Sequence, residues 1–332
     1  MIHRKDETDA INVRGLNLDG IHLEAFAASV HRAKFVTKII LRDCGLTDKE
    51  GISIVKQLNK GLVKHLDMSE NSTLSGKFYE ELGNLMEDEK AVLERIEIED
   101  NQIGDQILID LVEHLLYGRI SYLNVSKNGI TDVGAVAIAK LIRFCPNLRL
   151  LFLHYNKIMG IGGLDIAHSV GLSKSLQVFD ISFNSITGSG FKIQKDEKQD
   201  GEKREKPKKQ AKKKKVIGGD KKPEVPVSFA ELFAQGFSEP WAAAFRRNKS
   251  LLHVDMSHNH ISLTDVEIIA DGLKDNHSIL GIHFIGNDGD VDAKGFVNPQ
   301  VPFSVGESSV LVRMQTNGLK GGVVNDSRKF EL

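Results

Sequence analysis

The densest group of potentially reactive side chains is a set of histidines in the last third of the chain. His253, His258, His260, His277 and His283 all fall between positions 253 and 283, and imidazole is a common ligand of zinc and other transition metals. No cysteine or paired acidic residue accompanies them to complete a recognisable ligand set. We therefore expect no metal and no other cofactor, and a polar contact surface is the favoured interpretation.

Two short motifs have the form of catalytic or phosphate-binding signatures. His258-Asn259-His260 has the same residue sequence as a nuclease motif. Gly160-Ile-Gly162-Gly163 precedes a predicted helix, as a phosphate-binding loop would. The glycine segment lacks the Lys-Ser/Thr pair and the full glycine fingerprint of such loops. Both motifs also fall at regular positions of the repeat described next. We therefore expect no catalytic residues and predict that the chain is not an enzyme.

One repeating pattern must position all of these residues. Leu93-x-x-Ile96-x-Ile98-x-x-Asn101-x-Ile103 recurs with the same apolar spacing along most of the chain. The position that Asn101 occupies in this copy, here called the asparagine position, falls at residues 16, 44, 71, 101, 128, 156, 184, 259 and 287. Successive spacings are 28, 27, 30, 27, 28, 28, 75 and 28, and the value 75 is one period of 28 plus 47 inserted residues. The chain therefore contains nine copies with one interruption.

Each copy predicts a strand, a turn and a helix. The two apolar residues of Leu-x-Leu share one face of a strand, and the asparagine can then satisfy buried backbone groups of adjacent turns. Cys44 takes the asparagine position in the second copy as a weak donor. Thr131-Asp132 and Thr47-Asp48 are typical helix N-caps before apolar residues at helical spacing. Units stacked in series give a parallel sheet on one surface and helices on the other.

This pattern resembles the leucine-rich repeat, and the period of about 28 resembles its ribonuclease-inhibitor type. The stretch from Leu251 to Val297 is also similar to uncharacterised repeat proteins of ciliated and flagellated protists. The resemblance implies an α/β horseshoe of about nine strand-helix units, with the parallel sheet on the concave face and the helices on the convex face. We expect a repeat domain over 1–298 that is interrupted at 192–224, followed by an irregular tail or partial cap over 299–332.

The repeat register also predicts which side chains face the concave surface. Residues between and beside the buried strand positions point into the cavity, and aromatic residues on adjacent units favour a protein interface. The predicted partner-binding residues are Tyr122, Asn124, Phe152, His154, Tyr155, Asp180, Phe183, His253, Asp255 and His258. The alternative is that Phe152 and Phe183 pack on loops of the same chain, including part of the insert.

The insert carries the strongest charge feature. Residues 192–223 contain fourteen Lys and Arg against six Asp and Glu, so the local balance is +8 in a chain of net charge −1. We expect 192–224 to be a disordered loop. Its basic run includes Lys208, Lys209, Lys212, Lys213, Lys214 and Lys215. The run could bind an acidic protein surface such as a microtubule, serve as a nuclear-import signal, or be a solvated loop with no selective partner. Nucleic-acid binding is disfavoured because no aromatic residue within the run could stack on a base.

Composition excludes several classes of protein. Apolar runs fall short of the ~20 residues of a membrane span, the first ten residues lack the apolar stretch of a signal peptide, and the chain has only two cysteines. We expect a cytoplasmic protein without membrane contact, in the cytoskeleton or a cilium as the more specific location, with the nucleus as a lesser alternative.

Two functions remain open. The first is a non-enzymatic scaffold that binds another protein through the concave face, and a cytoskeletal or ciliary component is its most specific form. The second is regulation of a small GTPase, because similar repeats occur in Ran GTPase-activating proteins, whose family chemistry involves an early arginine and a long acidic tail. This chain ends in Ser327-Arg-Lys-Phe-Glu-Leu332, without such a tail, and nothing in the sequence singles out Arg42. The scaffold is the favoured interpretation.

Overall fold

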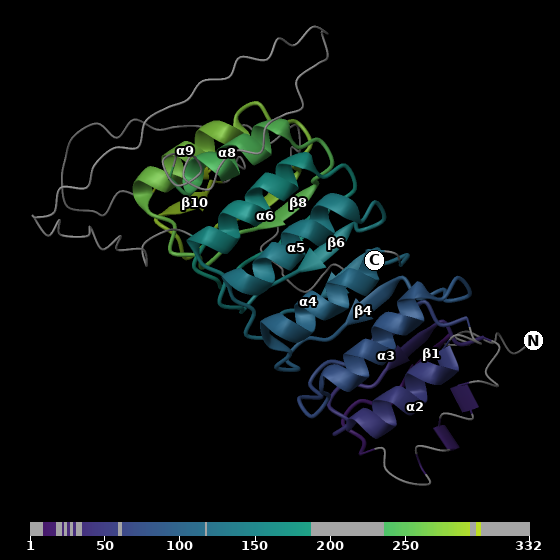
Figure 1. Cartoon of the computed structure of the whole chain (residues 1–332). Helices are drawn as coiled ribbons and strands as arrows, with labels where there is room; N and C mark the ends of the chain where they lie inside the picture. Colours follow the sequence, from purple (N-terminus) through teal and green to yellow (C-terminus); the bar gives the residue numbers. More distant parts are fainter. Residues whose placement is uncertain are drawn as a thin grey trace, which may run out of the picture.

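The computed structural model arranges the chain as a row of strands backed by a row of helices (Figure 1). It describes residues 9–17, 22, 25–26, 29–30, 35–58, 62–116, 118–186, 236–292 and 297–299. Within these ranges strands and helices alternate along an arc, with the sheet on the concave face and the helices on the convex face. This is the leucine-rich repeat architecture that the sequence predicts.

Nine strands form one parallel sheet in chain order. They are β1 (Ala10–Asn12), β2 (Lys38–Ile40), β3 (His65–Asp67), β4 (Arg95–Glu97), β5 (Tyr122–Asn124), β6 (Leu150–Phe152), β7 (Val178–Asp180), β8 (His253–Asp255) and β9 (Gly281–His283). Each strand pairs with the next so that equivalent repeat positions lie side by side. The register continues from β7 to β8, where Val178 is opposite His253, so the sheet is continuous across the long insertion.

Helices cover the convex side of the sheet. They are α2 (Asp48–Leu58), α3 (Gly76–Glu87), α4 (Gly104–Leu115), α5 (Asp132–Phe144), α6 (Gly160–Leu172), α8 (Ser238–Arg247) and α9 (Leu263–Leu273). The predicted N-cap at Thr131 is confirmed, because its hydroxyl accepts a hydrogen bond from the backbone nitrogen of Val133 at 3.3 Å. Consecutive helices are also joined at these ends: the Asp105 carboxylate accepts from the backbone nitrogen of Thr131 at 2.8 Å.

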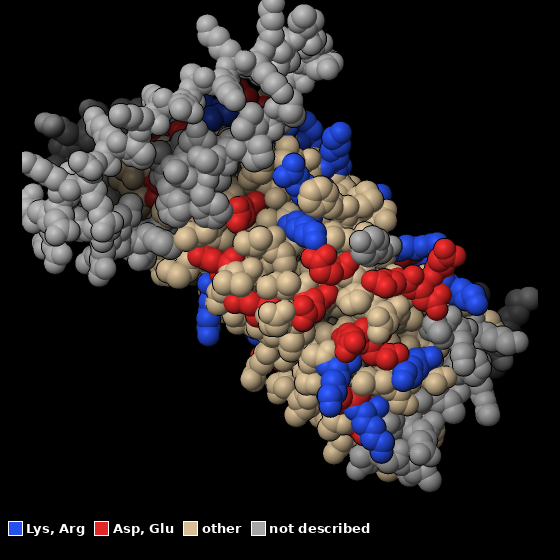
Figure 2. Space-filling view, viewed as in Figure 1, with Lys and Arg blue, Asp and Glu red and all other residues tan. Residues whose placement is uncertain are grey.

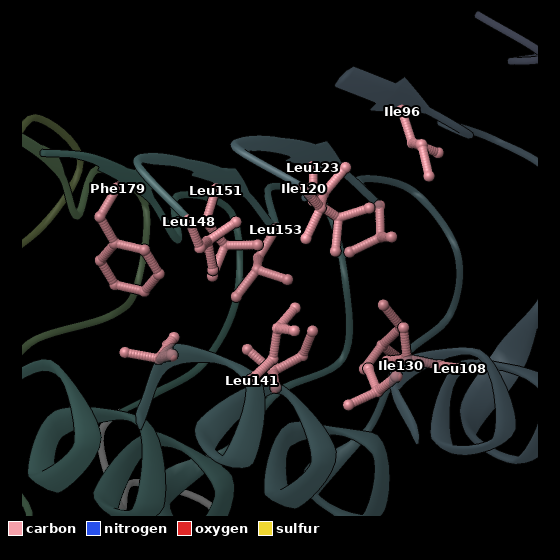
Figure 3. Packing of buried hydrophobic residues seen from close by; sticks show 14 of the residues in the cluster. Ile96, Leu108, Ile120, Leu123, Ile130, Leu141, Leu148, Leu151, Leu153 and Phe179 are labelled. Carbon is pink, nitrogen blue, oxygen red and sulfur yellow. The ribbon is translucent and has the colours of Figure 1, made fainter. Parts of the chain in front are cut away.

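The core lies between the sheet and the helices along the whole arc (Figure 3). In each repeat the middle residue of the strand points into this layer, as Leu123, Leu151 and Phe179 do with no exposed surface. Helix residues such as Leu108 and Leu141 close the layer from the other side. A repeat therefore buries its apolar face only against its neighbours, which is why the units are stable as a stack and not singly.

Asparagine side chains join the repeats at the turn after each strand. Asn128 donates to the carbonyl of Ile98 in the preceding repeat at 2.7 Å and accepts from the backbone nitrogen of Asn101 at 2.9 Å. The same cross-repeat donation is made by Asn71, Asn101, Asn156, Asn184, Asn259 and Asn287. Cys44 donates its thiol to the carbonyl of Val13 at 3.1 Å. The predicted ladder, including its cysteine position, is confirmed.

The two ends of the arc differ from the inner repeats. Leu16, at the asparagine position of the first copy, is 57% exposed. After β9 the chain forms an antiparallel pair, β10 (Gly289–Val291) and β11 (Val297–Pro299). Val297 of this pair is fully buried and joins the core beside α9. The pair therefore covers apolar surface of the last helix, as a terminal repeat requires.

Candidate functional site

The parallel register sorts the concave face into columns of side chains. The first and third residues of each strand point away from the helices, and in-register neighbours are about 4.8 Å apart. One column contains Tyr122, Leu150, Val178 and His253 on β5 to β8. The next contains Asn124, Phe152, Asp180, Asp255 and His283 on β5 to β9. Most of the predicted partner-binding residues therefore lie on a single continuous surface.

Three aromatic side chains form a stack at the rim of this surface. Tyr155 and Phe183 are parallel within 11° with ring centroids 4.0 Å apart, and Phe183 and His258 are 4.2 Å apart at 18°. We call Tyr155, Phe183 and His258 the rim stack. Tyr155 is 49% exposed, so this stack offers aromatic surface to a ligand.

The rim stack depends on an unusual backbone conformation. Each of its residues directly precedes a ladder asparagine and has a φ of 53° to 54°, in the left-handed region that non-glycine residues rarely occupy. Lys127 holds the equivalent place one repeat earlier, with Nζ 5.9 Å from the Tyr155 ring centroid. Gly286 holds it one repeat later, and a Cβ there would lie 2.2 Å from Nδ1 of His258. The stack therefore runs between a lysine and a glycine.

A second aromatic pair lies deeper on the face. The Tyr122 and Phe152 rings are 5.1 Å apart, and the guanidinium of Arg95 lies 3.7 Å from the Tyr122 centroid. Half-buried Leu150 and Val178 follow Tyr122 in its column. Together Tyr122, Phe152, Leu150 and Val178 form what we call the central apolar patch. Leu150 and Val178 were missed by the sequence analysis, although their place at the first strand position was available as a signal.

Ion pairs occupy the face on the N-terminal side of this patch and continue beside it to Asp180 on β7. Arg42 contacts Glu70 at 2.6 Å and Glu99 at 3.5 Å, and Lys127 contacts Glu99 at 2.7 Å. His154 lies 3.9 Å from Glu99 and 3.1 Å from Asp180. These contacts link side chains from six repeats into one network.

The network shifts the protonation of its members. The imidazole of His154, followed by Lys127 and Arg42, holds the pKa of Glu99 well below its usual range against the opposing effect of burial. Burial alone would lower the pKa of His154, but contacts with Asp180 and Glu99 outweigh it and raise that pKa to about 9. His154 is therefore protonated at neutral pH and acts as a cation between two carboxylates.

Acidic and histidine side chains occupy the other end of the face. Asp180 and Asp255 lie opposite each other on β7 and β8. Burial, and then the charge of Asp180, raise the pKa of Asp255. The rings of His253 and His283 are 4.8 Å apart, and burial together with His283 lowers the pKa of His253 to about 4. His253 is therefore neutral at pH 7.

The structure divides the ten predicted residues into three groups. Tyr155, Phe183 and His258 form the rim stack, and Tyr122 and Phe152 form part of the central apolar patch. The other five belong to the polar part of the face: Asn124, His154, Asp180, His253 and Asp255. Phe152 and Phe183 thus have ring partners within the repeats themselves. Asn124 is only 6% exposed, and its amide lies 3.4 Å from Glu99, so it contributes little contact surface.

Other predictions concern metals, membranes and the insert. No set of three or more His, Cys, Asp or Glu side chains among the described residues is arranged to hold a metal ion. Within the same part of the chain, no helix is long and apolar enough to cross a bilayer. The basic insert, with Lys208, Lys209 and Lys212–215, lies outside the described residues.

A groove on the opposite side of the molecule was not foreseen from the sequence. It lies between α3 and α4 and is lined by Tyr79, Glu80, Ile107, Asp110 and Glu113, among others. Figure 2 shows that acidic side chains gather over this middle part of the helix face. Glu113 is paired with Lys140 at 2.6 Å and His114 with Glu87 at 2.8 Å. Side chains of the groove are therefore partly neutralised by neighbouring helices.

Comparison with protein families supports the repeat assignment. Residues 120–139 and 247–270 match the Leucine Rich repeat model. These two segments lie on either side of the insert, and each contains a strand of the continuous sheet followed by part of a helix. The chain has the leucine-rich repeat architecture, and these two segments match the sequence model of the repeat.

Similarity to individual proteins is low. The chain is 25% identical over 159 residues to human capping protein, Arp2/3 and myosin-I linker protein 3, which covers 46% of this chain and 11% of that protein. The rat protein of the same name is 24% identical over 147 residues, covering 42% and 11%. The chain thus spans about a tenth of the length of these curated relatives.

Two solved structures show weak likeness. The leucine-rich repeat-containing protein LegL7 from Legionella pneumophila has a TM-score of 0.43 at 13% identity, covering 83% of this chain and 73% of that one. An internalin (inlF) from Listeria monocytogenes has a TM-score of 0.36 at 12% identity, covering 78% and 64%.

Proposed function

We propose that the chain is a non-enzymatic scaffold that binds another protein through its concave face. The observation that carries this proposal is the rim stack, in which the rings of Tyr155, Phe183 and His258 from three consecutive repeats stack on one another with Tyr155 half exposed. Left-handed backbone costs a non-glycine residue roughly 1–3 kcal/mol. Asp43, Glu70, Asp100 and Lys127 hold the same left-handed backbone at the equivalent position of earlier repeats, so the feature particular to the rim stack is its aromatic side chains and not its backbone.

The chemistry of the face supports binding over catalysis. Aromatic side chains with half-buried apolar neighbours provide the contact area of interface hot spots. The strongest ionic contacts, at Arg42, Glu99 and Lys127, are made within the chain itself. Arg42 is tied to two carboxylates with 19% of its side chain exposed, which disfavours the alternative in which an early arginine serves a small GTPase.

A more specific form of the proposal places the partner in the cytoskeleton. The names of the matched relatives describe them as linkers of capping protein, Arp2/3 and myosin-I. Alternation of strands with full helices supports the ribonuclease-inhibitor type of repeat. The similarity to protist repeat proteins adds a ciliary location to this proposal. Co-sedimentation with actin filaments and with microtubules at two salt concentrations tests it, because contacts of the basic insert must weaken as salt rises.

The direct test compares two faces of the same molecule. The double variant Tyr155→Ala/Phe183→Ala removes the exposed rings, and Val133→Ala/Val136→Ala removes exposed apolar side chains from α5 on the convex face. A partner purified from the native cell should bind the rim variant at least about tenfold more weakly, as expected for loss of hot-spot aromatics. It should bind the α5 variant as it binds the unmodified chain. If the rim variant binds the partner as tightly as the unmodified chain does, the hypothesis that the concave face is the binding surface is rejected.

A further inference from the structure

We infer that the partner presents a basic side chain, preferentially arginine, beside an apolar residue, and that these two groups lie over β6 to β8 of the concave face. This inference rests on the proposed function and specifies the chemistry of its ligand. It follows from an imbalance of charge between the two ends of the face and from the apolar surface beside that imbalance.

Most carboxylates in the N-terminal half of the face are neutralised by side chains of the same chain. Asp67 on β3 forms no ion pair among the described residues, but it is only 7% exposed and so is not accessible to a ligand. Glu70 and Glu99 are met by Arg42 and Lys127 at distances of 2.6 to 3.5 Å. Glu97 is met separately by Arg95 at 3.0 Å and by His65 at 2.6 Å. A charged ligand would have to break these contacts, so this half offers little gain in free energy to a partner's charge.

The network ends with one carboxylate left over. From Arg42 to Asp180 it holds three cations, Arg42, Lys127 and His154, and three carboxylates, Glu70, Glu99 and Asp180. Asp255 follows directly after Asp180 in the sheet and lies opposite His283 on β9. Burial and Asp180 raise the pKa of Asp255 and outweigh His283, which acts to lower it. The Oδ1 of Asp255 accepts from the backbone nitrogen of Ser257 at 2.9 Å, and no Lys, Arg or His among the described residues forms an ion pair with this carboxylate. On the accessible part of the face the excess negative charge is therefore located on β8, because Asp255 is half-buried whereas Asp67 is buried.

The neighbouring histidine does not supply the missing charge at neutral pH. His253 shares β8 with Asp255 but is neutral, because burial and His283 lower its pKa to about 4. The Asp180 charge is already engaged by His154 at 3.1 Å. Two adjacent carboxylates in a half-buried setting repel each other, and burial with Asp180 raises the pKa of Asp255 accordingly. A cation from outside would relieve this repulsion.

Apolar surface lies on the β6 side of the two carboxylates. Phe152 is directly opposite Asp180 on the adjacent strand, and Leu150 is opposite Val178 in the next column. An aromatic ring beside a carboxylate is a favourable setting for a guanidinium, which stacks on the ring while its edge donates to oxygen. The ligand that fits both groups is an arginine with an apolar neighbour.

The same face already contains one such arrangement made from its own residues. Arg95 lies 3.7 Å from the centroid of Tyr122 and 3.0 Å from Glu97. One cation thus covers an aromatic ring and neutralises a carboxylate at β4 and β5. At β6 to β8 the first strand positions hold Leu150, Val178 and His253 in place of an arginine. A partner's arginine over Phe152 and the carboxylates would complete the pattern.

The test uses a dodecamer peptide library displayed on phage and selected with the full chain. Selected peptides should be enriched in arginine or lysine next to an apolar residue. The best peptide is then titrated by calorimetry, together with its arginine-to-glutamine version, on the unmodified chain and on Asp255→Asn. Loss of the peptide arginine should weaken binding about tenfold on the unmodified chain and less than about twofold on Asp255→Asn. Glu113→Gln, on the helix side, is the matched control and should behave as the unmodified chain.

Each contrary result has a separate meaning. Selection of peptides without basic residues, or an equal loss on the unmodified chain and on Asp255→Asn, overturns this inference. If either result is found but Tyr155→Ala/Phe183→Ala still weakens binding of the native partner, the proposed function stands and only the inference about the basic side chain is overturned. A rise in peptide affinity of about tenfold on deletion of 192–224 would show that the chain's own lysines occupy the face, which also overturns the assignment to a partner. Asp255→Ser replaces Asp255→Asn if the latter unfolds at a lower temperature.

Discussion

The side-chain oxygen of Asn128 accepts a hydrogen bond from the backbone nitrogen of Asn101, 2.9 Å away in the preceding repeat. Its amide nitrogen donates to the carbonyl of Ile98, also in that repeat. One side chain therefore satisfies donors and acceptors of a neighbouring turn that would otherwise be buried without partners. Six further asparagines repeat this arrangement along the arc, and Cys44 makes the donation alone. The ladder thereby positions the binding face.

Replacement of Asn128 by alanine should destabilise the fold. The change leaves the carbonyls of Ile98 and Ser126 and the backbone nitrogen of Asn101 without their present partner, so we expect a loss of roughly 3 kcal/mol in the free energy of unfolding. Urea unfolding followed by circular dichroism measures it. Gln106→Ala, an exposed substitution on α4, should change the free energy by less than about 0.5 kcal/mol. Similar values for the two variants would refute the role of the ladder.

Both cysteines should be protected from thiol reagents in the folded chain. Cys44 and Cys145 are 1% exposed, and burial raises the pKa of each thiol, so the reactive thiolate is scarce. With Ellman's reagent at pH 8 we expect slow reaction in buffer and rapid reaction of two thiols per chain in 6 M guanidinium chloride. Rapid reaction of either thiol in buffer would show that its repeat is not packed as described.

His154 should make stability depend on pH on the alkaline side. Its folded pKa of about 9 lies above its ordinary value of 6.5, so its stabilising contribution is complete below pH 6.5 and is lost as the pH rises through 9. By linkage the contribution is roughly 3 kcal/mol. The difference in unfolding free energy between the unmodified chain and His154→Gln should therefore shrink by that amount between pH 6 and pH 10. His168→Gln, at an exposed position on α6, is the control and should show a constant difference.

Gly286→Ala should disturb the end of the rim stack. The added Cβ would lie 2.2 Å from Nδ1 of His258, and the backbone φ of 78° disfavours any side chain. We expect a loss of roughly 2 kcal/mol in the free energy of unfolding. In a His258→Ala background, Gly286→Ala should lower the free energy of unfolding by less, because the clash with the imidazole is gone and only the backbone strain remains. An identical cost in both backgrounds would mean that the His258 ring does not occupy the place described.

Much of this architecture could be predicted from sequence because the repeat fixes it locally. The period places Leu151 in the core and Asn156 in the ladder whatever the rest of the chain does, and the register of β6 against β7 then follows. The columns of the concave face were predictable for the same reason. Tyr155, Phe183 and His258, which each precede a ladder asparagine, were predicted to face the partner, but their left-handed φ was not predicted.

Other features depend on contacts between repeats that no single period reveals. Asn248 and Asn276 form a second set of cross-repeat bonds at the ends of α8 and α9, with Asn276 donating to the carbonyl of Phe245 at 2.7 Å. The recurrence of Asn-x-Ser before an apolar residue was the available signal. The ion pairs of Glu99 with Arg42 and Lys127 bring together residues from three repeats and depend on rotamers. The antiparallel strands β10 and β11 lie beyond the repeat and carry no periodic signal.

The most direct measurement replaces Phe183 by the photo-crosslinking residue p-benzoylphenylalanine in the native cell. The account predicts a crosslink from position 183 to one partner protein, which Tyr155→Ala reduces, and no crosslink to that protein from the same residue placed at Val133 on α5. A crosslink to the partner from position 133 and none from position 183 would contradict the assignment of the concave face as the binding surface.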